Sequence, residues 1–278
     1  MQLSPRYGTD PIVTLDGQPD AIVEPAVRQR RRLAATLASF DDAQWSHASR
    51  CEGWSSRDVI VHLDSTNTFW TLAIAAGVRG EPTQFLSTFD PVTSPAQLVA
   101  GSADVSTKEV FERFVASTEA FVDLLQSLEG DDWSALAEAP PGHIGVSAVV
   151  HHALWDSWVH ERDILLPLGI APAVEPDEVA ACLRYGAALG PALAVTRGES
   201  NRARLTVAVT QPDLSIVVDI GDRVAVRSGP AQSDLHLTGD AVELLEALSI
   251  RRPLGQPIPA GSAWMLSGLS DTFDAPRA

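Results

Sequence analysis

The sequence predicts an α+β protein in which a four-helix bundle precedes a smaller domain of strands and helices. Residues 20–166 contain four segments whose apolar residues recur at helical intervals, whereas residues 204–238 contain short runs in which apolar and polar residues alternate. The change follows Pro172, so we place the two domains at residues 1–172 and 173–278. A chain of 278 residues with 45% hydrophobic content is long enough to build both cores.

The predicted bundle follows an extended arm over residues 1–20. Its helices are expected at residues 20–40, 55–77, 107–128 and 146–166. Ser55 and Asp58 have the spacing of a capping box, which marks the start of the second helix. Residues 81–101 contain three prolines and little periodicity, so they are predicted to form a loop. Pro140-Pro141-Gly142 interrupts the chain before the fourth helix.

The second domain is predicted to combine a helix, several short strands and another helix. The first helix covers residues 175–194, and the strands cover residues 204–210, 214–220, 223–228 and 234–238. Pro212-Asp213 and Gly221-Asp222 supply the turns between strands. Gly239-Asp240 opens the last helix, over residues 241–250. Strands followed by flanking helices are typical of an α+β domain.

Charge and hydropathy exclude two classes of partner. The formal charge of −16 repels a polyanion, so nucleic acid is not an expected ligand. Arg28 and the run from Arg30 to Arg32 are predicted to form a solvated helix face that pairs with acidic neighbours. The sequence contains no run of 18 or more apolar residues, so no membrane span is expected. Because the N-terminus does not resemble a secretory signal, we expect a cytoplasmic protein.

Neither cysteine is predicted to form a disulfide. Cys51 and Cys182 are far apart in the sequence and have no metal-binding or redox spacing. Each is most simply a small buried residue. Cys51 precedes a helix N-terminus, which favours a reactive thiol, but the sequence identifies no partner histidine for it.

Three side chains form a candidate metal site. Asp156 and His160 are four residues apart, so on a helix they lie on one face, one turn apart, and His62 lies on another predicted helix. Trp155 and Trp158 indicate that this face is buried, and a buried carboxylate needs a partner such as a metal. Three protein ligands leave one position open for water, substrate or a thiol, as in a catalytic zinc site.

The residues around this set leave alternatives open. His152 lies one turn before the aspartate, so it is a candidate fourth ligand or a replacement for His62. Either Glu161 or Asp163 orients a ligand imidazole, or both form a solvated face or pair with Arg162. The sequence has no Gly-x-Ser-x-Gly elbow, no Gly-x-Gly-x-x-Gly loop and no phosphate-binding loop.

Two segments resemble the signatures of a known family. Residues 51–63, with Gly-Trp-Ser-x-Arg-Asp followed by His62, resemble the first signature of the DinB-like, mycothiol-dependent maleylpyruvate isomerase family. Residues 156–163 resemble its second signature, usually Glu-x-x-Val-His-x-x-Asp, with aspartate in place of the glutamate. The C-terminal α+β domain is similar to the sterol-carrier-like domain of that family.

The resemblance implies a zinc-containing helical bundle that uses mycothiol or a similar small thiol. It assigns the metal ligands to His62, Asp156 and His160, and its functional arginine to Arg251 or Arg252. The glycine often found before that arginine is isoleucine here. A plain helix cap, favoured by the helix dipole, is the other interpretation of the arginine pair.

The expected function is therefore that of a zinc-dependent enzyme. It would use a low-molecular-weight thiol to isomerise or S-conjugate a small electrophilic substrate, and the sequence does not separate these two outcomes. The alternative is a non-catalytic DinB-like metal-binding scaffold, or a protein that binds lipid or another small ligand. The three candidate ligands favour the enzyme, because a pure scaffold has no need to bury two histidines and an aspartate.

Overall fold

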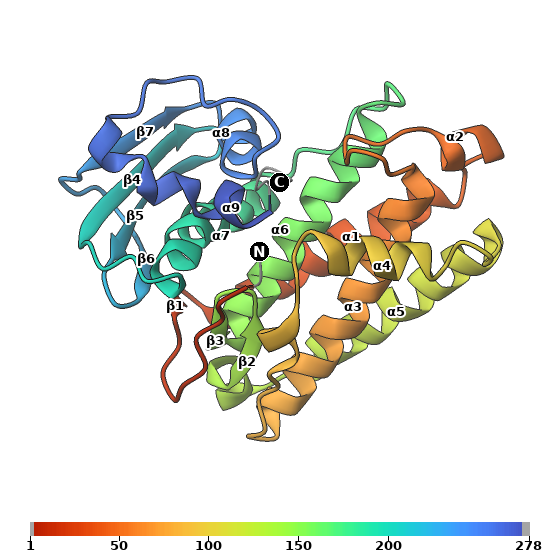
Figure 1. Cartoon of the computed structure of the whole chain (residues 1–278), viewed down its shortest axis with the longest axis horizontal. Coiled ribbons are helices and arrows are strands. Elements are labelled where there is room, and N and C mark those ends of the chain that lie inside the picture. The colour runs from red at the N-terminus through yellow and green to blue at the C-terminus, as the bar shows by residue number, and fades with distance from the viewer. Residues whose placement is uncertain (1–2, 274–278) are drawn as a thin grey trace.

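The computed structural model describes residues 3–273 and has a helical half and a sheet half, as Figure 1 shows. The four long helices of the bundle are confirmed: α1 (Val23–Leu37), α3 (Ser56–Val78), α5 (Thr107–Ser127) and α6 (Val146–Leu165). Helix α6 contacts α1, α3 and α7 (Pro176–Thr196), so it lies between the two halves. The helix that carries two candidate ligands is therefore the central one, and most of its side chains are buried.

Local sequence signals explain where the bundle helices begin. The capping box predicted for α3 is present: the Ser55 side chain accepts from the backbone N–H of Asp58, whose carboxylate accepts from the backbone N–H of Ser55. Ser106 caps α5 in the same way by accepting from the N–H of Glu109. These caps fix the first turn of α3, so His62 follows in its second turn.

The prediction of a loop over residues 81–101 is wrong. This segment contains the 3₁₀ helix η2 (Phe85–Thr88) and the helix α4 (Thr93–Ala100). The Asp90 carboxylate accepts from the N–H groups of Val92 and Thr93 at the start of α4. Pro95 lies in the first turn, where a missing N–H costs no helical hydrogen bond. The third proline of this segment therefore lies at the start of a helix and not in a loop.

Other short elements were not predicted. They are α2 (Asp42–Ser46), α9 (Trp264–Phe273) and a hairpin of β2 (Leu136–Ala139) with β3 (Gly142–Gly145). The Pro140-Pro141 break is the turn of that hairpin. Helix α2 and the two hairpin strands span only four or five residues, too few for a hydrophobic period to stand out in the sequence.

The sheet half contains five strands in the order β1-β6-β5-β4-β7. Strands β4 (Ala203–Thr210), β5 (Asp213–Ile220), β6 (Val224–Ser228) and β7 (Leu235–Gly239) confirm the predicted runs. Pairs β4–β5 and β5–β6 are antiparallel, whereas β4–β7 and β1–β6 are parallel. Helix α7 packs on β5 and β6, and α8 (Ala241–Leu248) packs near β7.

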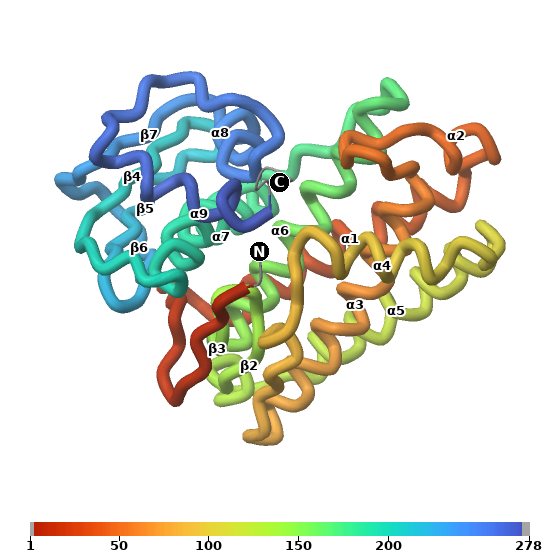
Figure 2. Tube along the Cα trace, in the orientation of Figure 1, coloured from red at the N-terminus to blue at the C-terminus, as the bar shows by residue number. Residues whose placement is uncertain are grey.

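The N-terminal arm connects the two halves. Its strand β1 (Val13–Leu15) extends the sheet by pairing with β6, and Figure 2 shows the arm running beside the β2–β3 hairpin. Arg6 forms a bridge with Gly142, whose φ of 124° and close approach to the Arg6 backbone leave no room for a Cβ. The boundary predicted after residue 172 lies in the connection between α6 and α7 and stays a prediction.

Within the described residues 3–273, one helix, α7, is long and apolar enough to cross a membrane. However, 83% of its apolar window is buried inside the protein. Its hydropathy is explained by its position, because it packs between the bundle and the sheet.

Candidate metal centre

The predicted ligand set comes together between α3 and α6. Asp156 Oδ1 lies 3.9 Å from His62 Nε2 and 3.6 Å from His160 Nε2, and the two imidazole ring centroids are 4.9 Å apart. Ligand atoms bound tetrahedrally at 2.0–2.2 Å from zinc would be about 3.4 Å from each other. The observed separations exceed this value by only a few tenths of an ångström. The three ligand atoms all lie within 4.8 Å of one another, so the three side chains are close enough together to hold a metal ion.

The carboxylate of Asp156 fits a cation. Its Oδ2 atom is buried and has no hydrogen-bond partner, and a buried carboxylate oxygen without a partner is costly. Burial raises the pKa of Asp156, but its interactions with His62 and His160 outweigh burial and hold the pKa well below its usual value. Asp156 is therefore ionised at neutral pH. Two imidazoles and one carboxylate form a donor set that zinc accepts.

Asp163 orients the candidate ligand His160. The Nδ1–H of His160 donates to Asp163 Oδ2 at 3.0 Å, which directs Nε2 toward Asp156. Burial lowers the pKa of His160, but its neighbours Cys51, Asp163 and Asp156 outweigh burial and raise the pKa to about 10. The interpretation of Asp163 as part of a solvated face is wrong, because its side chain is fully buried.

Glu161 is also buried rather than solvated. It accepts hydrogen bonds from Gln29 and Arg32 instead of pairing with Arg162. Arg162 pairs with Glu246 of α8 and stacks over the Trp158 ring. The acidic residues that follow His160 therefore connect α6 to its neighbours.

The two arginines that follow α8, Arg251 and Arg252, lie in different environments. Arg251 Nη2 lies 2.9 Å from Asp163 Oδ2, so it approaches the same carboxylate as His160. Arg252 pairs with Glu243 at 2.7 Å on the surface. Arg50, from the segment before α3, contacts Asp163 Oδ1 at 3.0 Å. Of the two candidates, only Arg251 thus lies beside the ligand set.

Backbone geometry explains the position of Arg251. Helix α8 ends in a Schellman motif, with the N–H of Arg251 donating to Glu246 O at 2.8 Å and the N–H of Ile250 donating to Ala247 O at 3.1 Å. Ile250 occupies the left-handed position with φ of 54°. That conformation costs a non-glycine residue about 1–2 kcal/mol. The isoleucine therefore holds a position that suits glycine, and it turns the chain toward Asp163.

Cys51 has the histidine neighbour that the sequence did not identify. Its Sγ lies 3.6 Å from His160 Nδ1 and 3.3 Å from Asp163 Oδ2. Cys51, His160 and Asp163 are also close enough together to hold a metal ion. Two guanidinium groups, from Arg50 and Arg251, already balance the Asp163 charge, which makes this second set the poorer cation site. Both cysteines are free; Cys182 is buried as predicted, whereas Cys51 is only half-buried.

His152 lies outside the ligand set. Its Nδ1 is 2.7 Å from the hydroxyl of Tyr185, and its ring packs between Trp70 and Trp155. Burial lowers the pKa of His152 to about 4, against the opposing charge of Asp156. It is therefore neutral at neutral pH, and neither potential metal-binding group among the described residues includes it.

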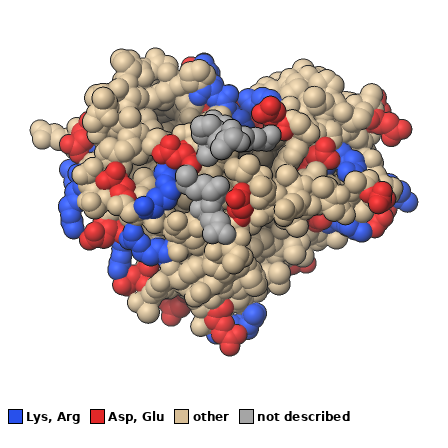
Figure 3. Space-filling view, in the orientation of Figure 1, with Lys and Arg blue, Asp and Glu red and all other residues tan. Residues whose placement is uncertain are grey.

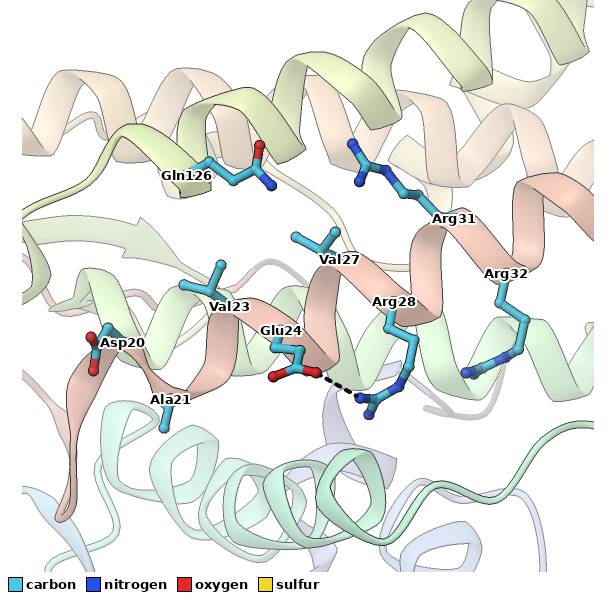
Figure 4. Close-up of a pocket in the computed structure, with 9 residues that line it drawn as sticks. All are labelled: Asp20, Ala21, Val23, Glu24, Val27, Arg28, Arg31, Arg32 and Gln126. Carbon is cyan, nitrogen blue, oxygen red and sulfur yellow. Dashed lines mark ion pairs between the residues drawn. The ribbon is translucent and has the colours of Figure 1, made fainter.

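The arginine-rich face of α1 lines a pocket, shown in Figure 4, and none of the three candidate ligands is among its lining residues. Arg28 pairs with Glu24, Asp177 and Glu178, and Arg31 pairs with Glu119. This part of the predicted acid pairing is observed. On the face in Figure 3, acidic and basic side chains are interspersed. Arg30 departs from the prediction, because it is buried rather than solvated.

The structural class is a helical bundle joined to a five-stranded sheet, with two histidines and a carboxylate on facing helices of the bundle. Residues 26–165 match the family model described as mycothiol maleylpyruvate isomerase N-terminal domain. The chain belongs to this family, which is named for an enzyme class. No curated protein matches it significantly.

Two solved structures have a similar fold. One is a crystal structure of the mycothiol-dependent maleylpyruvate isomerase, with 13% sequence identity and a TM-score of 0.61. The other is a histidine-to-alanine mutant of the mycothiol-dependent maleylpyruvate isomerase, with 16% identity and a TM-score of 0.61. Each alignment covers 85% of this chain and 91% of the other. The similarity therefore extends over both halves of the fold.

Proposed function

We propose that this protein is a zinc-dependent enzyme that uses mycothiol or a similar low-molecular-weight thiol on a small electrophilic substrate. The supporting observation is that His62, Asp156 and His160 offer ligand atoms within 4.8 Å of one another, and that the buried Asp156 Oδ2 atom lacks a hydrogen-bond partner. A zinc ion held there would bind the cofactor thiol as a thiolate and so supply a nucleophile. Family membership supports the choice of thiol and of an isomerase.

Each side chain of the site has a separate proposed role. His62, Asp156 and His160 would hold the metal, and the hydrogen bond to Asp163 would keep the His160 Nε2 lone pair directed toward it. Arg251 carries a positive charge beside the site and is 22% exposed, so it can contact an anionic substrate or a developing enolate. With these roles, the electrophile would bind between the bundle and the loop after α8.

Two outcomes remain chemically open to this arrangement. In an isomerisation, the thiolate would add to a conjugated double bond to give an enolate, rotation would occur about the resulting single bond, and re-formation of the double bond would expel the thiolate. In an S-conjugation, the adduct takes up a proton and is the product. The isomerisation is the first choice, because the family is named for it.

The test combines zinc-loaded protein with mycothiol and maleylpyruvate, and separately with a panel of other electrophiles. Isomer formation is followed by nuclear magnetic resonance and thiol adducts by mass spectrometry. We expect turnover only when zinc and thiol are both present, with loss in His160→Ala. The exposed His47→Ala is the matched control and should retain turnover. Full metal occupancy without thiol binding or turnover would favour the non-catalytic scaffold.

A further inference from the structure

Arg30 is a buried cation that the proposed chemistry does not use. It is 1% exposed, and its Nη1 atom is buried without a hydrogen-bond partner. The neighbouring arginines of α1 pair with carboxylates, but no such ion pair is formed by Arg30 among the residues that the structure describes. An arginine remains charged inside a protein, so this burial needs another explanation.

The guanidinium of Arg30 contacts each of the other three long bundle helices. Its Nε donates to Asn67 Oδ1 of α3 at 3.1 Å, and its Nη2 donates to the backbone oxygen of Ala153 of α6 at 2.9 Å. Its Cζ lies 4.4 Å from the centroid of the Phe121 ring of α5. The planar guanidinium thus bridges α3 and α6 directly and stacks on the Phe121 ring of α5.

The two bridged helices are the ones that carry the candidate metal ligands. Asn67 follows His62 by five residues on α3, and Ala153 precedes Asp156 by about one turn on α6. Burial lowers the pKa of Arg30 to about 10, while the charge of Asp156 opposes that shift. Arg30 therefore lies within electrostatic reach of the ligand Asp156 without pairing with it.

We propose that Arg30 is a positioning residue, which fixes the separation of α3 and α6 and thereby holds His62 and Asp156 at metal-binding distance. The inference rests on the proposed metal centre. Stability alone does not explain Arg30, because replacing a buried ion with a well-packed apolar side chain is often neutral or stabilising. The bridge between two ligand-bearing helices is a role that an apolar side chain cannot take over.

The direction of the change in zinc affinity on replacing Arg30 distinguishes a positioning role from a purely electrostatic one. A positive charge near a cation site weakens cation binding, so removing the charge of Arg30 alone would strengthen it. Removing the bridge loosens the ligand geometry and would weaken metal binding. A decrease in zinc affinity on removal of Arg30 therefore shows that the positioning effect is the larger.

The test compares Arg30→Met with Arg31→Met, a matched control at the adjacent exposed arginine. Zinc affinity is measured by competition with a chromogenic chelator, and the visible spectrum of the cobalt-loaded protein reports ligand geometry. We expect Arg30→Met to bind zinc about 10- to 100-fold more weakly, the range for residues that orient metal ligands, with an altered cobalt spectrum. Arg31→Met should behave like the parent. Unchanged or tighter zinc binding in Arg30→Met would overturn the inference.

Two further variants keep the inference testable if Arg30→Met does not fold. Arg30→Lys retains the charge but lacks the planar fork, so we expect weakened zinc binding. Asn67→Ala removes the acceptor on α3 and should weaken binding in the same direction, by less. Parental affinity in both variants would refute the role of Arg30 while leaving the metal centre intact. If the parent protein itself binds no zinc, the metal centre and this inference fail together.

Discussion

Metal binding should release a proton from His160, which gives the candidate centre a measurable dependence on pH. In the metal-free protein, Cys51, Asp163 and Asp156 outweigh burial and raise the pKa of this imidazole to about 10. His160 is therefore protonated throughout the neutral range. A metal needs the neutral imidazole, so each binding event must displace that proton.

The size of the effect follows from the raised pKa. Below pH 10, the zinc association constant should rise about tenfold per pH unit, because one proton leaves per metal bound. An ordinary histidine, with a pKa of about 6.5, would give an association constant that no longer changes above pH 7.5 or so. Between pH 7 and pH 9 the two cases therefore differ by about two orders of magnitude.

The assay is zinc competition against a chelator of known proton affinity, from pH 7 to pH 9. Calorimetry in buffers with different ionisation enthalpies should independently count about one proton released per zinc. In Asp163→Asn, the charge that helps raise the pKa of His160 is lost, so the affinity should level off at a lower pH. A zinc affinity in the parent that is flat from pH 7 to pH 9 would refute the assigned charge state of His160.

The same raised pKa affects the stability of the metal-free protein. A group whose pKa is higher in the folded state stabilises the fold fully below its unfolded value, here about 6.5. That contribution is lost as the pH rises toward the folded value of about 10. The unfolding midpoint of metal-free protein in urea should therefore fall over this range. A midpoint that rises with pH would have the wrong sign for this explanation.

Substitutions at four positions test the remaining assignments. Asp156→Glu should retain zinc and Asp156→Ala should lose it in metal analysis, because only the first keeps a carboxylate ligand; equal occupancy would remove Asp156 from the site. Arg251→Ala should lower kcat/KM by about 2–4 kcal/mol in transition-state free energy without loss of zinc, whereas Arg252→Ala, whose partner is at the surface, should change little. Tyr185→Phe should lower the free energy of unfolding by about 1 kcal/mol, the usual value of one hydrogen bond, and leave zinc affinity unchanged, because it removes only the hydrogen bond between Tyr185 and His152. Zinc loss in Tyr185→Phe would return His152 to the ligand set.

Much of the fold could be predicted from the sequence, because the long elements have strong periodic patterns. The bundle helices and the strands from β4 to β7 span enough residues for their hydrophobic periods to show. The strand β1 could not be predicted, because three residues carry no period and its partner β6 lies about 210 residues later. The helix α4 was missed for a different reason, since a proline in the first turn resembles a loop signal.

Part of the candidate site could likewise be predicted from local sequence patterns, whereas the rest depends on tertiary packing. The spacing of Asp156 and His160 on one helix is visible in the sequence, and the family signature adds His62. The burial of Asp163 and its contact with Arg251 depend on how the second domain docks, which no local pattern encodes. Arg30 was misassigned because a run of arginines on a helix normally faces solvent, and only the bundle geometry turns it inward.

The central claim is that His62, Asp156 and His160 hold a metal that binds the cofactor thiol directly. Titration of cobalt-loaded protein with mycothiol tests this claim, because a sulfur ligand on cobalt gives a charge-transfer absorption band in the near ultraviolet. If the metal binds the thiol directly, this band should saturate at one thiol per cobalt and should be absent in His160→Ala. Stoichiometric cobalt binding with no such band at saturating mycothiol would contradict it.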